Sequence, residues 1–230
     1  DSMSGSTTDA TGSDDSTGNP LVGECVLHSQ CGTGYCLTYQ DSPPDPDSIC
    51  TRGPDGGNTR FTATLYDFTT GDPIPDTDVN VVGAVDALAD PELAPVVFIT
   101  TTDGDGRIDH TTASPLDETL GVLSLVDPEG YVLTGTGLAQ SPYGPGNIIH
   151  DAWAVPSDTV DAWETALEDN VGFAPYLPLV AEGATVGMVR DGLTGTPLAG
   201  ATLIPTAPND AVIRYLDADG TSFSADATSD

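Results

Sequence analysis

The sequence predicts a mainly β protein, with tandem antiparallel β-sandwiches preceded by a small disulfide-rich module and a disordered tether. Three observations support this fold class. Short runs of β-branched and aromatic residues recur between turn signals, and 26 glycines with 19 prolines disfavour long helices. Four cysteines also lie close together near the N-terminus.

The first segment, residues 1–22, is predicted to be a disordered acidic tether. It opens "DSMSGSTTDATGSDDSTGNP", and so few apolar residues cannot offset the entropy of ordering the chain. Tethers of this composition commonly separate a lipid-anchored cysteine from a folded domain in bacterial envelope lipoproteins. A lipid anchor ahead of Asp1 is therefore the only membrane attachment that we expect, and the sequence leaves its presence open.

The second segment, residues 23–52, is predicted to be a disulfide-stapled module. An even number of clustered cysteines without a C-x-x-C pair favours two disulfides and an oxidising compartment. A zinc site that also used His28 is the alternative, but the spacings match no zinc knuckle or ribbon. Three connectivities are open, and we expect the interlaced pairs Cys25–Cys36 and Cys31–Cys50.

Residues 60–155 are predicted to form the first sandwich. In "FTATLYDF", Phe61, Ala63 and Leu65 alternate with polar residues, as in a strand with one buried face. The runs "DVNVVGAV" and "PVVFITT" follow as further strands. The runs "LGVLSLV" and "YVLTGTG" flank Asp-Pro-Glu-Gly at 127–130, which predicts a hairpin.

Residues 156–183 are predicted to be a helix and a linker. Ser157 or Asp158 is expected to cap the helix, and Val160, Trp163 and Leu167 share one face at i, i+3 and i+7. We expect Trp163 to pack against the sandwich, with ligand stacking as the alternative.

Two stretches of the chain are similar to each other. "TGDPIPDTDVNV" begins at Thr70 and "TGTPLAGATLIP" begins at Thr194, and the strands before them also correspond. At these residues, and at "TTDGDGRI" from Thr101, the sequence resembles the transthyretin-like, carboxypeptidase-regulatory-like sandwiches, which are Ig-like in architecture. The resemblance implies a second sandwich at 184–230.

The second copy is expected to be incomplete. If the final Thr-Ser-Asp at 228–230 corresponds to Thr101–Asp103, the closing hairpin would lie beyond Asp230. The alternative uses Asp217–Gly220 as the closing turn of a shortened domain. We favour the first of these interpretations.

The loop "TTTDGDGRID" suggests a weak calcium site. With Gly106 at position 6 of an EF-hand-like loop, Asp103 and Asp105 occupy ligand positions and Asp109 lies nearby. Positions 1 and 12, however, are Thr101 and Thr112, which removes two strong ligands. We therefore favour a structural hairpin, with weak calcium binding as a secondary expectation and no other cofactor.

No catalytic motif is recognisable, and we expect no enzymatic activity. The intradiol dioxygenases share a related sandwich and bind iron through two Tyr and two His. Tyr131, Tyr143, His110 and His150 would supply those residue types, but no motif of the family is present. In "NIIHDAWAV", His150, Asp151 and Trp153 suggest either a pocket or, as we favour, plain strand residues.

A formal net charge of −31, with five arginines and no lysine, excludes nucleic acid and anionic lipid as partners. No apolar run approaches the length of a membrane span. These features predict an exported protein, extracellular or in the outer cell envelope, that presents sandwich modules for display or adhesion to a partner we cannot name. The alternatives are an accessory region of a larger secreted hydrolase and a calcium- or carbohydrate-binding module.

Overall fold

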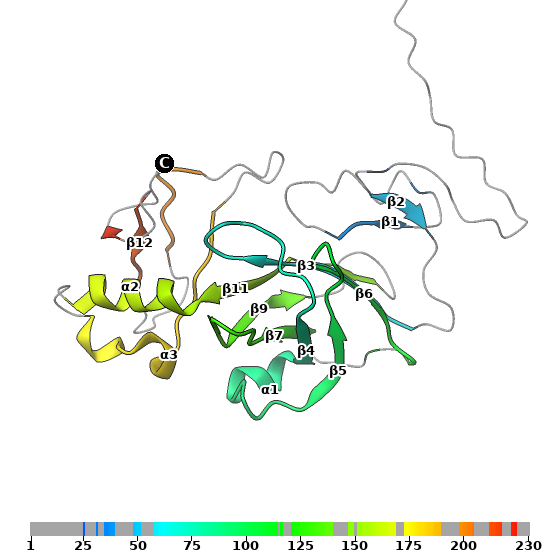
Figure 1. Ribbon diagram of the computed structural model, residues 1–230, viewed down its shortest axis with the longest axis horizontal. Helices are drawn as coiled ribbons and strands as arrows, with labels where there is room; N and C mark the ends of the chain where they lie inside the picture. Colours follow the sequence, from blue (N-terminus) through cyan, green and yellow to red (C-terminus); the bar gives the residue numbers. More distant parts are fainter. Residues whose placement is uncertain are drawn as a thin grey trace, which may run out of the picture.

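The computed structural model confirms the mainly β fold class (Figure 1). No helix among the described residues is long and apolar enough to cross a membrane. The structure describes residues 25, 31, 35–39, 48–51, 58–114, 116, 121–139, 147–149, 151–168, 173–189, 198–204, 212–217 and 222–224.

One sheet of the sandwich is built around the long strand β3. Strand β6 pairs with β3 antiparallel on one side, while β10 and then β11 pair with it in parallel on the other. Strand β8 pairs with β11 at the outer edge. The bounds are β3 (Arg60–Asp67), β6 (Arg107–Thr111), β8 (Tyr131–Val132), β10 (Asn147–Ile149) and β11 (Ala152–Pro156).

The other sheet is antiparallel throughout, in the order β5-β4-β7-β9. Its strands are β4 (Asp78–Gly83), β5 (Val96–Thr101), β7 (Val122–Val126) and β9 (Thr134–Ala139). The predicted hairpin is confirmed, because β7 pairs with β9 across the turn that ends at Gly130, whose φ is +88°. Glycine tolerates this left-handed conformation without strain.

The core lies between the two sheets. Phe61, Ala63 and Leu65 of β3 are fully buried, as the alternation predicted. They pack against a cluster of aliphatic side chains from the neighbouring and facing strands, namely Val79, Val81, Ile108, Val122, Val126, Ala152 and Ala154.

The parallel pairs of β3 correct the expectation of a purely antiparallel sandwich. Parallel neighbours need a long crossover connection, because a tight turn can join only antiparallel strands. Here all four strands of the other sheet, β4, β5, β7 and β9, lie between β3 and its parallel partners along the chain, together with β6 and β8 of the same sheet.

A second correction concerns the end of β4. The run "DVNVVGAV" was expected to be strand throughout, but the strand ends at Gly83 and helix α1 (Ala84–Ala89) follows. The segment AVDALA contains three alanines, and alanine is the strongest helix former.

Helix α2 (Ser157–Glu168) buries Val160, Trp163 and Leu167, which confirms the predicted packing face. The helix begins at Ser157, one residue before the position expected if Ser157 were the cap. A short 3-10 helix η3 (Ala174–Tyr176) and helix α3 (Leu179–Glu182) follow, and the Leu179 amide donates to Glu164 Oε1 at 2.6 Å.

Of residues 184–230, the described part contains one two-stranded sheet, β12 (Tyr215–Leu216) with β13 (Phe223–Ser224). Phe223 contacts Trp163 edge to face, with ring centroids 6.4 Å apart. The stretch Asp217–Gly220 lies between these two strands, and the Asp217 amide donates to the Ser222 carbonyl. A second sandwich at 184–230, which we expect to be incomplete, stays a prediction.

Candidate functional site

The proposed calcium loop is a tight turn that connects β5 of one sheet to β6 of the other, and these two strands do not pair with each other as in a hairpin. Asp103 Oδ1 accepts hydrogen bonds from the amides of Asp105 and Arg107, both at 2.9 Å. The Gly106 amide donates to the Asp103 carbonyl at 3.0 Å. One oxygen of the Asp103 carboxylate is therefore engaged by the turn itself, as in an Asx turn.

The same turn contacts the loop that begins with Thr70. A Cβ added to Gly106 would lie 2.7 Å from Pro73 Cβ, and its φ of +75° favours glycine. Thr102 Oγ1 donates to the Ile74 carbonyl and accepts from the Thr77 amide. The two motifs that carried the family resemblance thus stabilise each other, which explains their residues structurally.

Asp109 does not face this loop. It lies on β6, where Arg60 Nε donates to Oδ1 at 2.7 Å and the Tyr39 hydroxyl donates to Oδ2 at 3.0 Å. Burial alone would raise the pKa of Asp109, but hydrogen bonding to Arg60 and its charge outweigh this and hold the pKa below its usual value. Asp103, Asp105 and Asp109 do not form a shared cluster of ligand atoms among the described residues.

The N-terminal module packs on the outer face of β3. Thr62 Oγ1 donates to the Thr38 carbonyl at 2.8 Å, and Thr64 Oγ1 donates to the Tyr39 carbonyl at 2.7 Å. The guanidinium of Arg107 lies 5.1 Å from the centre of the Tyr39 ring, a cation–π contact. Thr62 and Thr64 are consequently buried, so β3 has two buried faces where the sequence predicted one.

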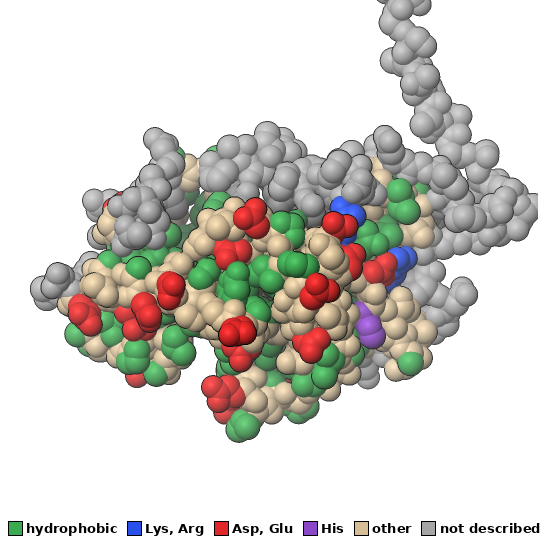
Figure 2. All heavy atoms as spheres, in the orientation of Figure 1, with side chains coloured by type: hydrophobic (Ala, Val, Ile, Leu, Met, Phe, Trp, Pro, Cys, Tyr) green, Lys and Arg blue, Asp and Glu red, His purple; other side chains and the backbone are tan. Residues whose placement is uncertain are grey.

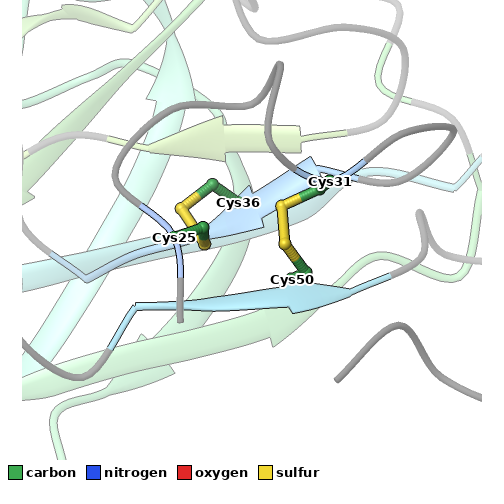
Figure 3. Close-up of a disulfide and its surroundings, with 4 residues drawn as sticks. All are labelled: Cys25, Cys31, Cys36 and Cys50. Atoms are coloured by element: carbon green, nitrogen blue, oxygen red, sulfur yellow. A yellow bond between two sulfur atoms is a disulfide. The ribbon is translucent and has the colours of Figure 1, made fainter. Parts of the chain in front are cut away.

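Within the module, β1 (Tyr35–Leu37) pairs with β2 (Ile49–Thr51). Disulfides join Cys25 to Cys36 and Cys31 to Cys50, the interlaced pairing that we expected (Figure 3). The sulfurs of Cys25, Cys31 and Cys50 lie within 4.8 Å of one another, yet each is bonded to another sulfur. They are not thiolate ligands for a metal, and His28 lies outside the described residues.

Sequence reasoning missed a second network around Asp67, at the end of β3. Asp67 Oδ1 accepts from the amides of Thr69 and Thr70, and the Tyr131 hydroxyl donates to Oδ2 at 3.0 Å. Burial opposes ionisation of Asp67, but these hydrogen bonds lower its pKa overall, while burial and the Asp67 carboxylate raise the pKa of Tyr131. Asp67 lies directly before Thr-Thr-Gly, a turn signal that could have suggested its role.

The other residues that were considered for chemistry do not assemble a site in the described part. His110 stacks on Phe98, with ring centroids 4.3 Å apart. Tyr131 bonds to Asp67, and Tyr143 and His150 lie outside the described residues. Trp153 contacts Tyr66 and Phe68, and β10 and β11 confirm that "NIIHDAWAV" is mainly strand.

A groove of about 980 Å³ lies between the sheets and the segment around α3. Its walls combine aromatic and aliphatic side chains with the Thr-Gly repeat of β9, including Trp153, Leu133, Thr136, Gly137 and Met188. Figure 2 shows acidic side chains scattered over the visible face and the basic ones at the end near the module. The groove is thus largely apolar, and Glu92 and Asp151 are the acidic residues that line it in the part of the chain that the structure describes.

No protein-family model and no curated protein matches the sequence. Among solved structures, the chain is similar to shaft pilin SpaA from Lactobacillus rhamnosus GG, with 14% identity, a TM-score of 0.28, and 43% of this chain and 51% of that chain covered. Catechol 1,2-dioxygenase from Acinetobacter sp. ADP1 is 14% identical with a TM-score of 0.30, and the alignment covers 51% of this chain and 56% of that chain. A group B streptococcus pilus 2b backbone protein is 12% identical with a TM-score of 0.30, and the alignment covers 50% of this chain and 45% of that chain.

These alignments span only about half of the pilin, dioxygenase and backbone-protein chains. At such TM-scores the likeness carries no argument about function. The residues themselves define a mainly β protein in which a disulfide-bonded module is hydrogen-bonded to the outer face of a sandwich.

Proposed function

We propose that this chain is an exported, non-enzymatic protein of the cell envelope that presents β-sandwich modules for display or adhesion. The observation that carries the proposal is the pair of disulfides in a module docked on the sheet. Disulfides persist in oxidising compartments and are rare in the cytosol, where thiols are kept reduced.

The charge supports the same location. A net charge of −31 keeps copies of the protein apart and soluble at an exposed surface, and it repels nucleic acid. Attachment through a lipid on a cysteine ahead of Asp1, with residues 1–22 as the tether, is part of this proposal.

Antibody labelling of intact cells tests the location. An antibody raised against the folded sandwich should label intact cells, and a cytosolic marker should stay unlabelled. Amine-reactive surface labels are unsuitable because the chain has no lysine. Labelling that appears only after lysis, with four free thiols on titration of the native protein, would overturn the proposal.

The groove favours a second candidate, a carbohydrate-binding module. Trp153, which is partly exposed, lines the groove beside Thr136 and Gly137, and aromatic faces with nearby hydroxyls suit sugar rings. Titration with soluble oligosaccharides, read out by Trp fluorescence and compared with Trp153→Ala, would test it. Calcium binding is tested separately by the melting temperature in millimolar calcium, with magnesium as the control.

A further inference from the structure

The segment from α1 to β5 concentrates exposed apolar side chains. Six of the fourteen exposed large hydrophobic residues in the described part fall between residues 85 and 99, with Leu93 79% and Leu88 72% exposed. We call these six side chains the β5–α1 surface: Val85, Leu88, Leu93, Val96, Val97 and Ile99. A concentration of exposed apolar side chains on one segment points to an interaction site more than singly scattered ones do.

Strand β5 also offers a backbone edge. It is the last strand in its sheet, and across the described residues it pairs with β4 alone. The register shifts once, next to Val97, and is regular from Phe98 to Thr101. The regular half thus presents amide and carbonyl groups to which a further strand can add.

Two of the usual protections of an edge strand, charged side chains and proline, are missing from β5. Edge strands are commonly blunted by charged side chains, above all lysine, or by proline within the strand. The strand reads VVFITT and carries no charge, while Ile99 is 58% exposed on it. Its one irregularity, the shift at Val97, leaves the rest of the edge open.

The charge around the β5–α1 surface indicates which kind of partner strand can bind there. Asp86, Asp90 and Glu92 are exposed on the same segment, and Asp78 is exposed on β4 opposite Thr101. A second copy of the chain would bring these same carboxylates to the contact, together with its net charge of −31. A partner segment flanked by lysine or arginine would instead meet complementary charge. Figure 2 shows acidic and hydrophobic side chains side by side on the lower lobe, to which α1 and β5 belong in Figure 1.

We propose that the β5–α1 surface is a docking site for an extended segment of another protein. That segment adds a strand to the free edge of β5, places apolar side chains on the six exposed residues, and carries lysine or arginine at its ends. The inference does not depend on the envelope location proposed above.

A pair of synthetic peptides tests it. Both have the same alternating Val-Thr centre, and one has two arginines at each end where the other has two glutamates. Amide hydrogen exchange of the full chain is the readout. The arginine peptide should slow exchange at Ile99 and Thr101 by at least about tenfold, and added salt should weaken the effect. The glutamate peptide should have no effect.

Matched variants distinguish binding at the β5–α1 surface from nonspecific hydrophobic binding elsewhere on the protein. Ile99→Lys should abolish the protection, whereas Ile204→Lys, at a residue 81% exposed outside the surface, should leave it intact. Leu93→Lys changes the surface without touching the sheet, so it serves if Ile99→Lys does not fold. It should weaken binding several-fold.

Three results would overturn the proposal. The first is protection by the glutamate peptide equal to that by the arginine peptide. The second is no protection of β5 by either peptide. The third is a concentration-dependent dimer that Ile99→Lys dissolves, since the occupant would then be a second copy.

Discussion

Arg60 Nε lies 2.7 Å from Asp109 Oδ1, across the paired strands β3 and β6, and the same carboxylate accepts a hydrogen bond from Tyr39 of the N-terminal module. The ion pair therefore lies where the N-terminal module contacts the sheet. Because both side chains are partly exposed, its contribution to stability is limited by solvent screening.

Asp109→Ala is expected to lower the free energy of unfolding by up to about 1 kcal/mol, since it removes the partner of Arg60 and Tyr39. Asp86→Ala is the control, because Asp86 is exposed on α1 and its loss merely reduces the repulsion in a chain of net charge −31. Urea denaturation at low and high salt measures the free energy of unfolding of both variants. Equal effects of the two variants would contradict the role given to Asp109.

Gly106→Ala is expected to destabilise the protein by about 2 kcal/mol or more, because alanine is strained at a φ of +75° and its Cβ would lie 2.7 Å from Pro73 Cβ. Gly104→Ala is the matched control two residues away, where an added Cβ meets nothing within 4 Å. Thermal melts of the two variants should differ by several degrees. A melt of Gly106→Ala equal to that of Gly104→Ala would refute the close approach of the two loops.

Thr62→Val with Thr64→Val is expected to loosen the module from the sheet. Each change removes a donor to a carbonyl of Thr38 or Tyr39 and should cost about 1 kcal/mol. Limited proteolysis within residues 38–52 should become faster while the sandwich stays folded. Thr111→Val, at an exposed threonine of β6, should leave the cleavage rate unchanged.

Asp67 is expected to make stability depend on pH. Its folded pKa lies below the unfolded value of about 3.9, so its contribution is present above pH 4 and is lost as the pH falls through the folded pKa. Asp67→Asn should therefore be less stable than the wild type at pH 7, and the difference should shrink below about pH 4. Asp72→Asn, at an exposed residue of the loop that follows β3, is the control, and a difference that persists at pH 2 would contradict this assignment.

Reduction of the two disulfides is expected to unfold the module and leave the sandwich in place. The bonds close loops with sequence separations of 11 and 19 residues, for which chain entropy gives about 3 kcal/mol each. The core cluster comes from residues 61–154 and needs no cysteine. Near-UV circular dichroism should keep the tryptophan signal after reduction, and complete loss of that signal would show that the module is essential to the whole fold.

The parts of the fold that depend on local pattern could be predicted from the sequence. The alternation at Phe61, Ala63 and Leu65 and the i, i+3, i+7 face of Val160, Trp163 and Leu167 are both buried as expected. Side-chain period alone determines which of these residues share a face, so no knowledge of distant partners was needed.

Contacts between distant segments could not be predicted in the same way. Thr62 and Thr64 look like the solvent side of a strand until Thr38 and Tyr39 are known to cover them. Asp109 looks like a calcium ligand until Arg60 is placed beside it by the register of β3 and β6. The sequence carries no local signal for either pairing, because both depend on how the sheet is assembled.

The parallel pairing of β3 with β10 and β11 has a consequence for the order of events during synthesis. Strand β3 ends at Asp67, but its parallel partners follow only from Asn147. At a synthesis rate of about 5 to 20 residues per second, β10 and β11 are made on the order of ten seconds after β3. The cysteines are all synthesised before that interval begins, so the N-terminal segment that covers β3 is complete before the parallel half of its sheet has been made.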